Sequence, residues 1–313
     1  MADTNKVSEQ LAVFSDVSPA LPALITQYAN HTAPHALMIS GQFGFGKTTL
    51  ASLLAQALMC EDENKPCGAC RQCVRVQNRS HANMLVVGLQ DKQRSVKVEQ
   101  ARDLLSDLAA YPFSAGPRLV LLELVDMFTP QAQNALLKAI EEPEPSTYFL
   151  LTCVNERAVL TTIRSRCQLL RLPAWTDEQV ERTLIQQGLP LQESKNLASL
   201  ALGSPGKALQ IQDDKAFWAI KRLVDEVLTP GLTLQDFPEA SKRFKDQKDN
   251  AGLILDTIEF SATHLASTNA RNHDTMSFAC RLYEGVVEAR RLQASNVSWQ
   301  AIIDALLLST IEE

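Results

Sequence analysis

A phosphate-binding pattern is the clearest chemical signal in the sequence. The segment Gly41-Gln42-Phe43-Gly44-Phe45-Gly46-Lys47-Thr48 matches G-x-x-x-x-G-K-[ST]. The glycines Gly41, Gly44 and Gly46 let backbone N–H groups converge on phosphates, and Lys47 would reach the β- and γ-phosphates. The hydroxyl of Thr48 would ligate Mg²⁺, with Thr49 beside it. A chance glycine-rich turn is the alternative. We expect ATP or ADP with Mg²⁺ here.

The acidic residues needed to hydrolyse ATP are altered. The apolar run Leu119–Leu122 continues into Glu123-Leu124-Val125-Asp126, where many such ATPases carry Asp and then Glu. Glu123 would bind Mg²⁺ through water, whereas Leu124 cannot activate water, a function that typically contributes about 10²–10⁴-fold. Asp126 is either a substitute or a solvated or helix-capping residue. The pattern predicts a very slow ATPase at most.

Four cysteines form a second chemical cluster. Cys60, Cys67, Cys70 and Cys73 have metal-ligand spacing and suit tetrahedral Zn²⁺ in a structural site without a catalytic water. Two disulfides or an iron–sulfur cluster are the alternatives. The acidic run 61–63 argues against contact of this loop with nucleic acid. The cysteines outside the cluster, Cys153, Cys167 and Cys280, are expected to be small buried apolar residues.

Strands and helices alternate around these motifs. Five short apolar runs predict strands at 36–40, 84–87, 118–122, 148–153 and 168–172, and apolar stripes predict helices over 50–58, 98–108 and 132–140. Such alternation is typical of a mostly parallel sheet covered on both faces. We expect an α/β P-loop domain over 1–172.

Strand signals stop after Leu172. Thr176 is expected to cap a helix that begins at Asp177. Residues 173–212 indicate a small helical unit that contains the turn Gly203-Ser204-Pro205-Gly206, and residues 213–313 indicate helices only. The chain is therefore expected to have three parts.

Composition sets further limits. The 313 residues are 45% hydrophobic and carry a formal net charge of −6, which excludes general disorder and disfavours a protein that binds DNA on its own. No apolar run approaches the roughly 18–20 residues that span a bilayer, and no secretory signal is visible. We expect a cytoplasmic protein without membrane contact, in which disulfides are unlikely to form.

Taken together, these features resemble the clamp-loader branch of the AAA+ proteins. The resemblance is carried by Pro34–Leu37, the phosphate loop, the four cysteines, Asn134–Pro143, Ser165-Arg166-Cys167 and Gly203–Leu209. It covers roughly Pro34 to Leu209 and extends weakly into the helical C-terminal part. The combination of Asn134–Pro143 with Ser-Arg-Cys is highly specific.

The resemblance implies a RecA-like AAA+ domain (1–172) with an inserted zinc module (60–73), a helical lid (173–212) and an all-α collar for oligomerisation (213–313). It implies a hetero-pentameric ring with gamma/tau and delta subunits, which places a sliding clamp on primed DNA as part of the DNA polymerase III holoenzyme, a nucleotidyltransferase. Arg166 would act in trans on ATP of the adjacent subunit; a surface ion pair is the alternative. Thr152 or Cys153 would be the sensor-one residue.

Departures from the family pattern indicate a subunit that assists hydrolysis rather than performing it. Glu123-Leu124 replaces the acidic pair, and Gly206 occupies the register of the lid arginine. An ATP-hydrolysing gamma/tau-type subunit is the main alternative. An unrelated P-loop phosphotransferase and a zinc-dependent nucleic-acid adaptor are two more distant ones.

Overall fold

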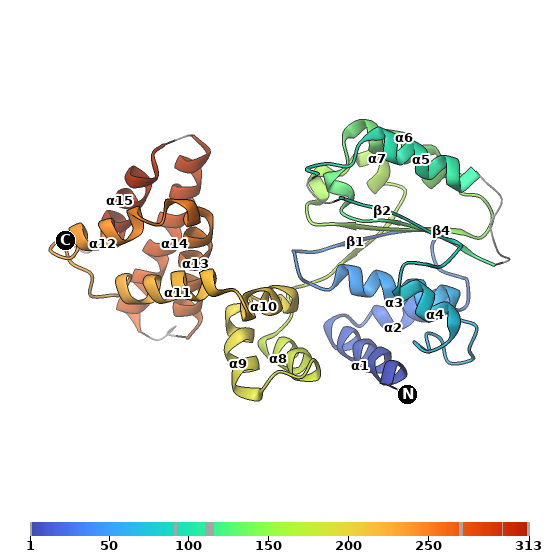
Figure 1. Ribbon diagram of the computed structural model, residues 1–313, viewed down its shortest axis with the longest axis horizontal. Coiled ribbons are helices and arrows are strands. Elements are labelled where there is room, and N and C mark those ends of the chain that lie inside the picture. The colour runs from blue at the N-terminus through green and yellow to red at the C-terminus, as the bar shows by residue number, and fades with distance from the viewer. Residues whose placement is uncertain (1, 91–92, 110–115, 269–271, 296, 312–313) are drawn as a thin grey trace. The chain divides into compact units, whose positions relative to one another are not determined.

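The computed structural model describes residues 2–90, 93–109, 116–268, 272–295 and 297–311 and is shown in Figure 1. It divides into two compact units. The first comprises Met1–Ser194 with Gly203–Lys207, and the second comprises Lys195–Leu202 with Ala208–Glu313. The finer division of the chain at Leu172 and Gln212 stays a prediction.

The first unit is built on a five-stranded parallel sheet. Its strands are β1 (Ala36–Ser40), β2 (Met84–Val87), β3 (Arg118–Leu122), β4 (Thr147–Cys153) and β5 (Gln168–Arg171), in the order β2-β3-β4-β1-β5. All four strand pairs are parallel. The five strands expected from the sequence are confirmed.

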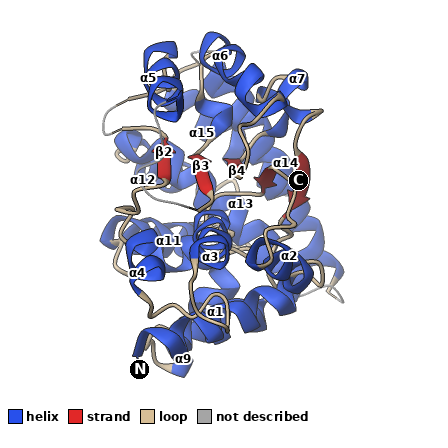
Figure 2. Cartoon of the chain, turned by 90° about the vertical axis from the view of Figure 1, so that its right-hand side faces the viewer, coloured by secondary structure: helices blue, strands red, loops and turns tan. Residues whose placement is uncertain are grey.

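Helices cover both faces of this sheet. One side carries α1 (Ala2–Val17), α2 (Leu21–Ala29), α3 (Lys47–Met59) and α4 (Arg71–Gln77), and the other carries α5 (Val98–Ala109), α6 (Pro130–Glu141) and α7 (Thr161–Arg164). Figures 1 and 2 show α3 and α6 on opposite sides of the strands. Because both faces are covered, every residue of β1, β3 and β4 is buried. These three strands are therefore mostly apolar, without an alternation of apolar and polar residues.

One buried polar side chain fixes the loops that follow two neighbouring strands. Gln133 in α6 is 1% exposed. Its Nε2 donates to the carbonyls of Phe128, at 3.1 Å, and Ala158, at 3.2 Å, while its Oε1 accepts from the N–H of Leu160 at 2.8 Å. These bonds hold the short helices η1 (Val125–Met127) and η2 (Glu156–Ala158) against α6. The chain is thereby directed into α7.

Beyond β5 the described residues form only helices. These are α8 (Asp177–Gln186), α9 (Leu191–Leu200), α10 (Pro205–Gln212), α11 (Lys215–Val227), α12 (Phe237–Lys245), η3 (Lys248–Asn250), α13 (Ala251–Thr268), α14 (His273–Ala294) and α15 (Trp299–Thr310). Thr176 caps α8 in a capping box with Gln179, as its position predicted. Within the described chain, none of the helices is both long and apolar enough to cross a membrane.

The second unit has its own apolar core. Side chains from α11 to α15 form it, including Ile258, Phe278 and Leu307. The indole of Trp299, also in this core, donates to the carbonyl of Phe244 at 3.0 Å. A separate core of this kind is what an independently packed helical unit requires.

The expected burial of the three scattered cysteines is only partly right. Cys153 is buried in β4 and Cys167 is half-buried, but Cys280 is exposed. The expectation for Cys280 was wrong because it lies on the face of α14 that also leaves Tyr283 and Val287 exposed. A cysteine's type alone does not tell which face of a helix it occupies.

Candidate functional site

The phosphate loop leads directly into α3. Gly46 is the residue before the helix, with a φ of 84° and no side chain to cap the first turn. The first N–H groups of a helix have no partner within it, and together with the helix dipole they favour an anion. The motif leads, as predicted, directly into a helix whose N-terminus has no side-chain cap, and anion binding there stays a prediction.

Lys47 lies folded against its own loop. Its Nζ donates to the carbonyl oxygens of Gly41, at 2.7 Å, and Gln42, at 2.8 Å. Burial lowers the pKa of Lys47, while the nearby groups of Cys153 and Asp126 act in the opposite direction. A phosphate bound to this loop would therefore compete with two carbonyls for the ammonium group.

The apex of the loop is bonded to the Gly203–Lys207 segment. The hydroxyl of Ser204 donates to the carbonyl of Phe43 at 2.9 Å, and the N–H of Gly206 donates to the carbonyl of Gly44 at 3.0 Å. A Cβ added to Gly206 would lie 2.6 Å from the Cα of Gly44. The two backbones therefore approach too closely for a side chain at position 206, where the family pattern has arginine.

A third carbonyl of the loop is bonded in the same way. The indole N–H of Trp175 donates to the carbonyl of Phe45 at 3.2 Å, and the ring of Trp175 meets that of Phe14 edge to face at 5.5 Å. A Cβ added to Gly46 would lie 2.8 Å from the ring of Phe14. The loop thus rests on two buried aromatic rings.

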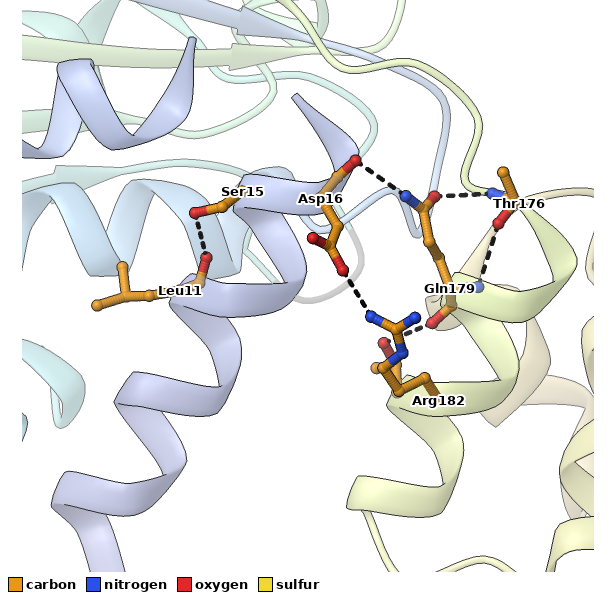
Figure 3. Close-up of polar contacts among 7 residues, drawn as sticks. Leu11, Ser15, Asp16, Thr176, Gln179 and Arg182 are labelled. Atoms are coloured by element: carbon orange, nitrogen blue, oxygen red, sulfur yellow. Dashed lines mark hydrogen bonds and ion pairs between the residues drawn. The ribbon is translucent and has the colours of Figure 1, made fainter. Parts of the chain in front are cut away.

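Helix α1, which carries Phe14, is also tied to α8. Asp16 forms an ion pair of 2.5 Å with Arg182, and its carbonyl accepts from the Nε2 of Gln179 at 3.0 Å, as Figure 3 shows. Gln179 is at the same time the capping-box partner of Thr176. The start of α8 and the end of α1 are therefore held together beside the loop.

The acidic side chain that follows β3 is bonded to an arginine. Glu123 accepts from both terminal nitrogens of Arg79, at 2.7 and 2.8 Å. Leu124, which follows, has a φ of 54°, and its N–H donates to the hydroxyl of Thr152 at 2.9 Å. If Glu123 is to hold Mg²⁺, as its position predicts, the pair with Arg79 must first open.

The two sensor-one candidates point in different directions. Thr152 and Cys153 are consecutive strand residues, so their side chains lie on opposite faces of the sheet. The Thr152 hydroxyl turns toward Leu124, whereas Cys153 lies near Ser40 at the entry to the phosphate loop, where burial raises the pKa of its thiol. The choice between them stays open.

Asp126 is a structural acceptor. Its Oδ2 accepts from the N–H groups of Val154, at 3.2 Å, and Asn155, at 2.9 Å. The expectation that it is solvated or caps a helix was wrong, because these two N–H groups follow directly after β4 and its side chain reaches them. Its Oδ1 is buried and makes no hydrogen bond within the described residues. Asp126 is thus the acidic group that sequence reasoning undervalued beside Lys47.

The four clustered cysteines converge as predicted. Their sulfur atoms all lie within 4.8 Å of one another, and the sulfurs of Cys60 and Cys70 are 3.9 Å apart. Tetrahedral Zn–S bonds of about 2.3 Å place the sulfurs about 3.8 Å apart. Backbone N–H groups approach Cys67 at 3.2 Å and Cys70 at 3.4 Å. The cluster has the shape of a closed four-sulfur metal site.

The thiols of the cluster differ in pKa, since burial raises the pKa of Cys60 and of Cys73. Burial by itself would also raise the pKa of Cys70, but hydrogen bonds from the backbone of Cys73 and Glu61, together with those from the thiols of Cys73 and Cys67, lower it to about 7. The thiolate is the form that binds a metal. The donor set therefore fits Zn²⁺.

Arg166 lies on the opposite side of the sheet from this cluster, just after α7. Its Nη2 forms an ion pair of 2.8 Å with Glu141, and its Nη1 donates to the carbonyl of Thr162 at 3.0 Å. The ion pair raises the pKa of Arg166 and lowers that of Glu141. The ion pair named as the alternative is thus present, and the side chain is still 33% exposed.

The close approach of Gly206 to Gly44 gives a first testable prediction. Gly206→Ala should lower the free energy of unfolding by about 1–3 kcal/mol, because the new methyl group overpacks the loop. Gly252→Ala is the matched control: Gly252 is likewise the second residue of a helix, but an added Cβ meets nothing within 4 Å. It should stabilise by about 0.5–1 kcal/mol. Urea unfolding measures the free energy of unfolding of each variant. Equal changes in the two variants would contradict the close contact at Gly206.

The chain is similar in sequence to several known proteins. The family model described as DNA polymerase III, delta subunit, matches residues 18–176. The delta' subunit of Haemophilus influenzae DNA polymerase III is 34% identical over 179 residues, which are 56% of this chain and 54% of that protein. The delta' subunit of Pseudomonas aeruginosa is 30% identical over 226 residues, 68% of each chain.

A tau/gamma subunit and a gamma subunit-related protein are similar as well. The tau/gamma subunit of Haemophilus influenzae is 29% identical over 224 residues, 69% of this chain and 32% of that protein. Among solved structures, a gamma subunit-related protein of Thermotoga maritima is 14% identical with a TM-score of 0.47, covering 93% of this chain and 98% of that one. The alignment with the first-named delta' relative spans about half of that protein's length. On the family match, the chain belongs to the delta' subunits of the DNA polymerase III clamp loader.

Proposed function

We propose that this chain assists ATP hydrolysis by an adjacent subunit of a clamp-loader ring and does not hydrolyse ATP efficiently itself. The observation that carries the proposal is the contrast between two side chains. Glu123, in the metal position, is engaged by Arg79, whereas Arg166 is partly exposed and held at the end of α7. The chain offers an arginine, and Leu124 stands at the position of the expected base.

The residues that follow β3 support the absence of efficient turnover. Leu124 has no group that accepts a proton, and its N–H is bonded to Thr152. Asp126, the other acidic group nearby, uses one carboxylate oxygen to bind the backbone after β4. Leu124 cannot deprotonate a water molecule, and Asp126 keeps only its buried Oδ1 without a partner among the described residues.

Nucleotide binding without turnover is part of the proposal. The N–H groups at the start of α3 and the glycines Gly41, Gly44 and Gly46 would hold the phosphates of ATP or ADP. Lys47 would exchange its two carbonyl partners for phosphate oxygens, and Thr48, with Thr49 beside it, would contribute to the Mg²⁺ shell. Bound Mg²⁺ would offset the phosphate charge.

Zn²⁺ is proposed for the four-cysteine cluster, which joins the end of α3 to the start of α4. All four ligand positions are sulfur, so no position is left for a reacting water. The ion would hold the insertion 60–73 in shape. We assign it no part in the chemistry of nucleotides.

The proposed partners follow from family membership. The chain would assemble with gamma/tau and delta subunits in a five-membered ring, through its helical second unit, and place the sliding clamp on primed DNA in the cytoplasm. Arg166 would reach the γ-phosphate of ATP on the next subunit, where a guanidinium stabilises the charge that develops during transfer.

The zinc assignment predicts one Zn²⁺ per chain in protein purified without added metal. Elemental analysis measures it directly. Cys73→Ser should release most of the metal, because Cys73 is a buried member of the cluster, whereas Cys280→Ser should release none, because Cys280 is exposed and remote in sequence. Iron in place of zinc, or equal metal content in the two variants, would overturn the assignment.

The isolated chain should turn over ATP far more slowly than about 1 s⁻¹, the lower end of ordinary enzyme rates, because Leu124 cannot activate water. Steady-state hydrolysis is the measurement, with Lys47→Ala prepared in parallel to reveal contaminating ATPases. Turnover near the ordinary range that disappears in Lys47→Ala would contradict the proposal and favour a gamma/tau-type enzyme.

Arg166→Ala should leave the fold and ring assembly intact and lower hydrolysis by the reconstituted ring severalfold. Arginine fingers contribute about 10³–10⁵ in rate, but only one of several sites loses its arginine. Arg166→Lys should not restore the rate fully, since an ammonium group lacks the planar fork. Gel filtration measures ring assembly, and the DNA-stimulated rate of ATP hydrolysis measures the effect of the arginine. Wild-type hydrolysis by an assembled Arg166→Ala ring would refute the proposed function.

A further inference from the structure

Two helix ends converge on the guanidinium of Arg166. Glu141 is the last residue of α6, and Thr162 lies in α7. Nη2 contacts the Glu141 carboxylate at 2.8 Å, and Nη1 donates to the Thr162 carbonyl at 3.0 Å. Each terminal nitrogen of arginine carries two hydrogens, so each keeps one for another acceptor. Nε is buried and has no partner within the described residues, so only the terminal nitrogens are available to an incoming group.

We propose that Glu141 is a positioning residue for Arg166: with the Thr162 carbonyl, it holds the guanidinium as a pre-oriented fork whose free hydrogens receive an oxyanion of a neighbouring subunit. This inference rests on the proposed function of Arg166. Long flexible side chains lose conformational freedom when they bind, and restraint before binding reduces that cost. Two planar donors fixed side by side match the bidentate geometry of a phosphate.

The place of Glu141 in its helix supports this role. A negative charge at the C-terminal end of a helix is unfavourable, because the exposed carbonyls there are already negative. The positive guanidinium of Arg166 offsets the negative charge of the Glu141 carboxylate and of these carbonyls, and it keeps the pKa of Glu141 low. Glu142, the next residue, is exposed, and the structure describes no ion pair for it within the resolved ranges. It provides a matched control of the same charge.

The first test follows Arg166 itself in the isolated chain. The ¹⁵N relaxation of the arginine Nε–H groups reports how well each side chain is ordered on the nanosecond timescale. The order of Arg166 should fall in Glu141→Ala, stay close to wild type in Glu141→Gln, which keeps a neutral acceptor at the same place, and be unchanged in Glu142→Ala. Unchanged order in Glu141→Ala would overturn the inference, whatever the ring's activity.

The second test uses the reconstituted ring. Glu141→Ala should lower kcat for ATP about twofold, by less than Arg166→Ala does, with KM unchanged; Glu141→Gln should recover most of the rate, and Glu142→Ala should match wild type. On an Arg166→Ala background, Glu141→Ala should add nothing, because both changes act through one side chain. A further loss on that background would show a general structural role and overturn the inference. Wild-type rates for Arg166→Ala would refute the proposed function instead.

Discussion

Three consecutive carbonyl groups of the phosphate loop point toward the segment that follows the sheet, and much of the first unit is arranged around them. Those of Phe43, Gly44 and Phe45 accept hydrogen bonds from two residues of the 203–207 segment and from one tryptophan. In a trans peptide the N–H points opposite to the carbonyl. The same bonds therefore turn the following N–H groups away from this segment, as a phosphate cradle needs. The contact leaves no room for a side chain on Gly206.

The first unit has its functional side chains in two places, at the carboxyl edge of the parallel sheet and in the turn between α7 and the start of β5. In sheets of this kind, ligands bind outside the carboxyl ends of the strands. After β3, the carboxylate of Glu123 is bonded to Arg79, and the N–H of Leu124, which has no group to activate water, is bonded to Thr152. After α7, by contrast, Arg166 keeps part of its guanidinium exposed. This contrast is the basis of the proposal that the chain contributes a cation to a neighbour's reaction.

The four-cysteine cluster is linked to the residues after β3 through α4. Cys60 directly follows α3, and Cys73 lies within α4, so the cluster holds the start of α4 against the end of α3. Helix α4 ends at Gln77, and Arg79 follows in a left-handed conformation with a φ of 53°. Because Arg79 follows α4 so closely in the chain, the position of α4 brings the Arg79 guanidinium to the Glu123 carboxylate. The cysteine cluster thus anchors the helix from which Arg79 extends to Glu123, the residue at the expected metal position.

The sequence by itself determined the features that depend on local pattern. Five apolar runs predicted the strands, G-x-x-x-x-G-K-T predicted the turn into α3, the cysteine spacing predicted the four-sulfur cluster, and Thr176 predicted the start of α8. Each follows from residues close together in the chain. Only the tertiary structure decided which partners the functional side chains have. Arg79 and Glu123 are 44 positions apart, and Ser204 and Phe43 are 161 apart. Asp126 and Cys280 were misjudged for the same reason: a side chain's partner and exposure depend on how distant segments pack, and local periodicity carries no information about that packing.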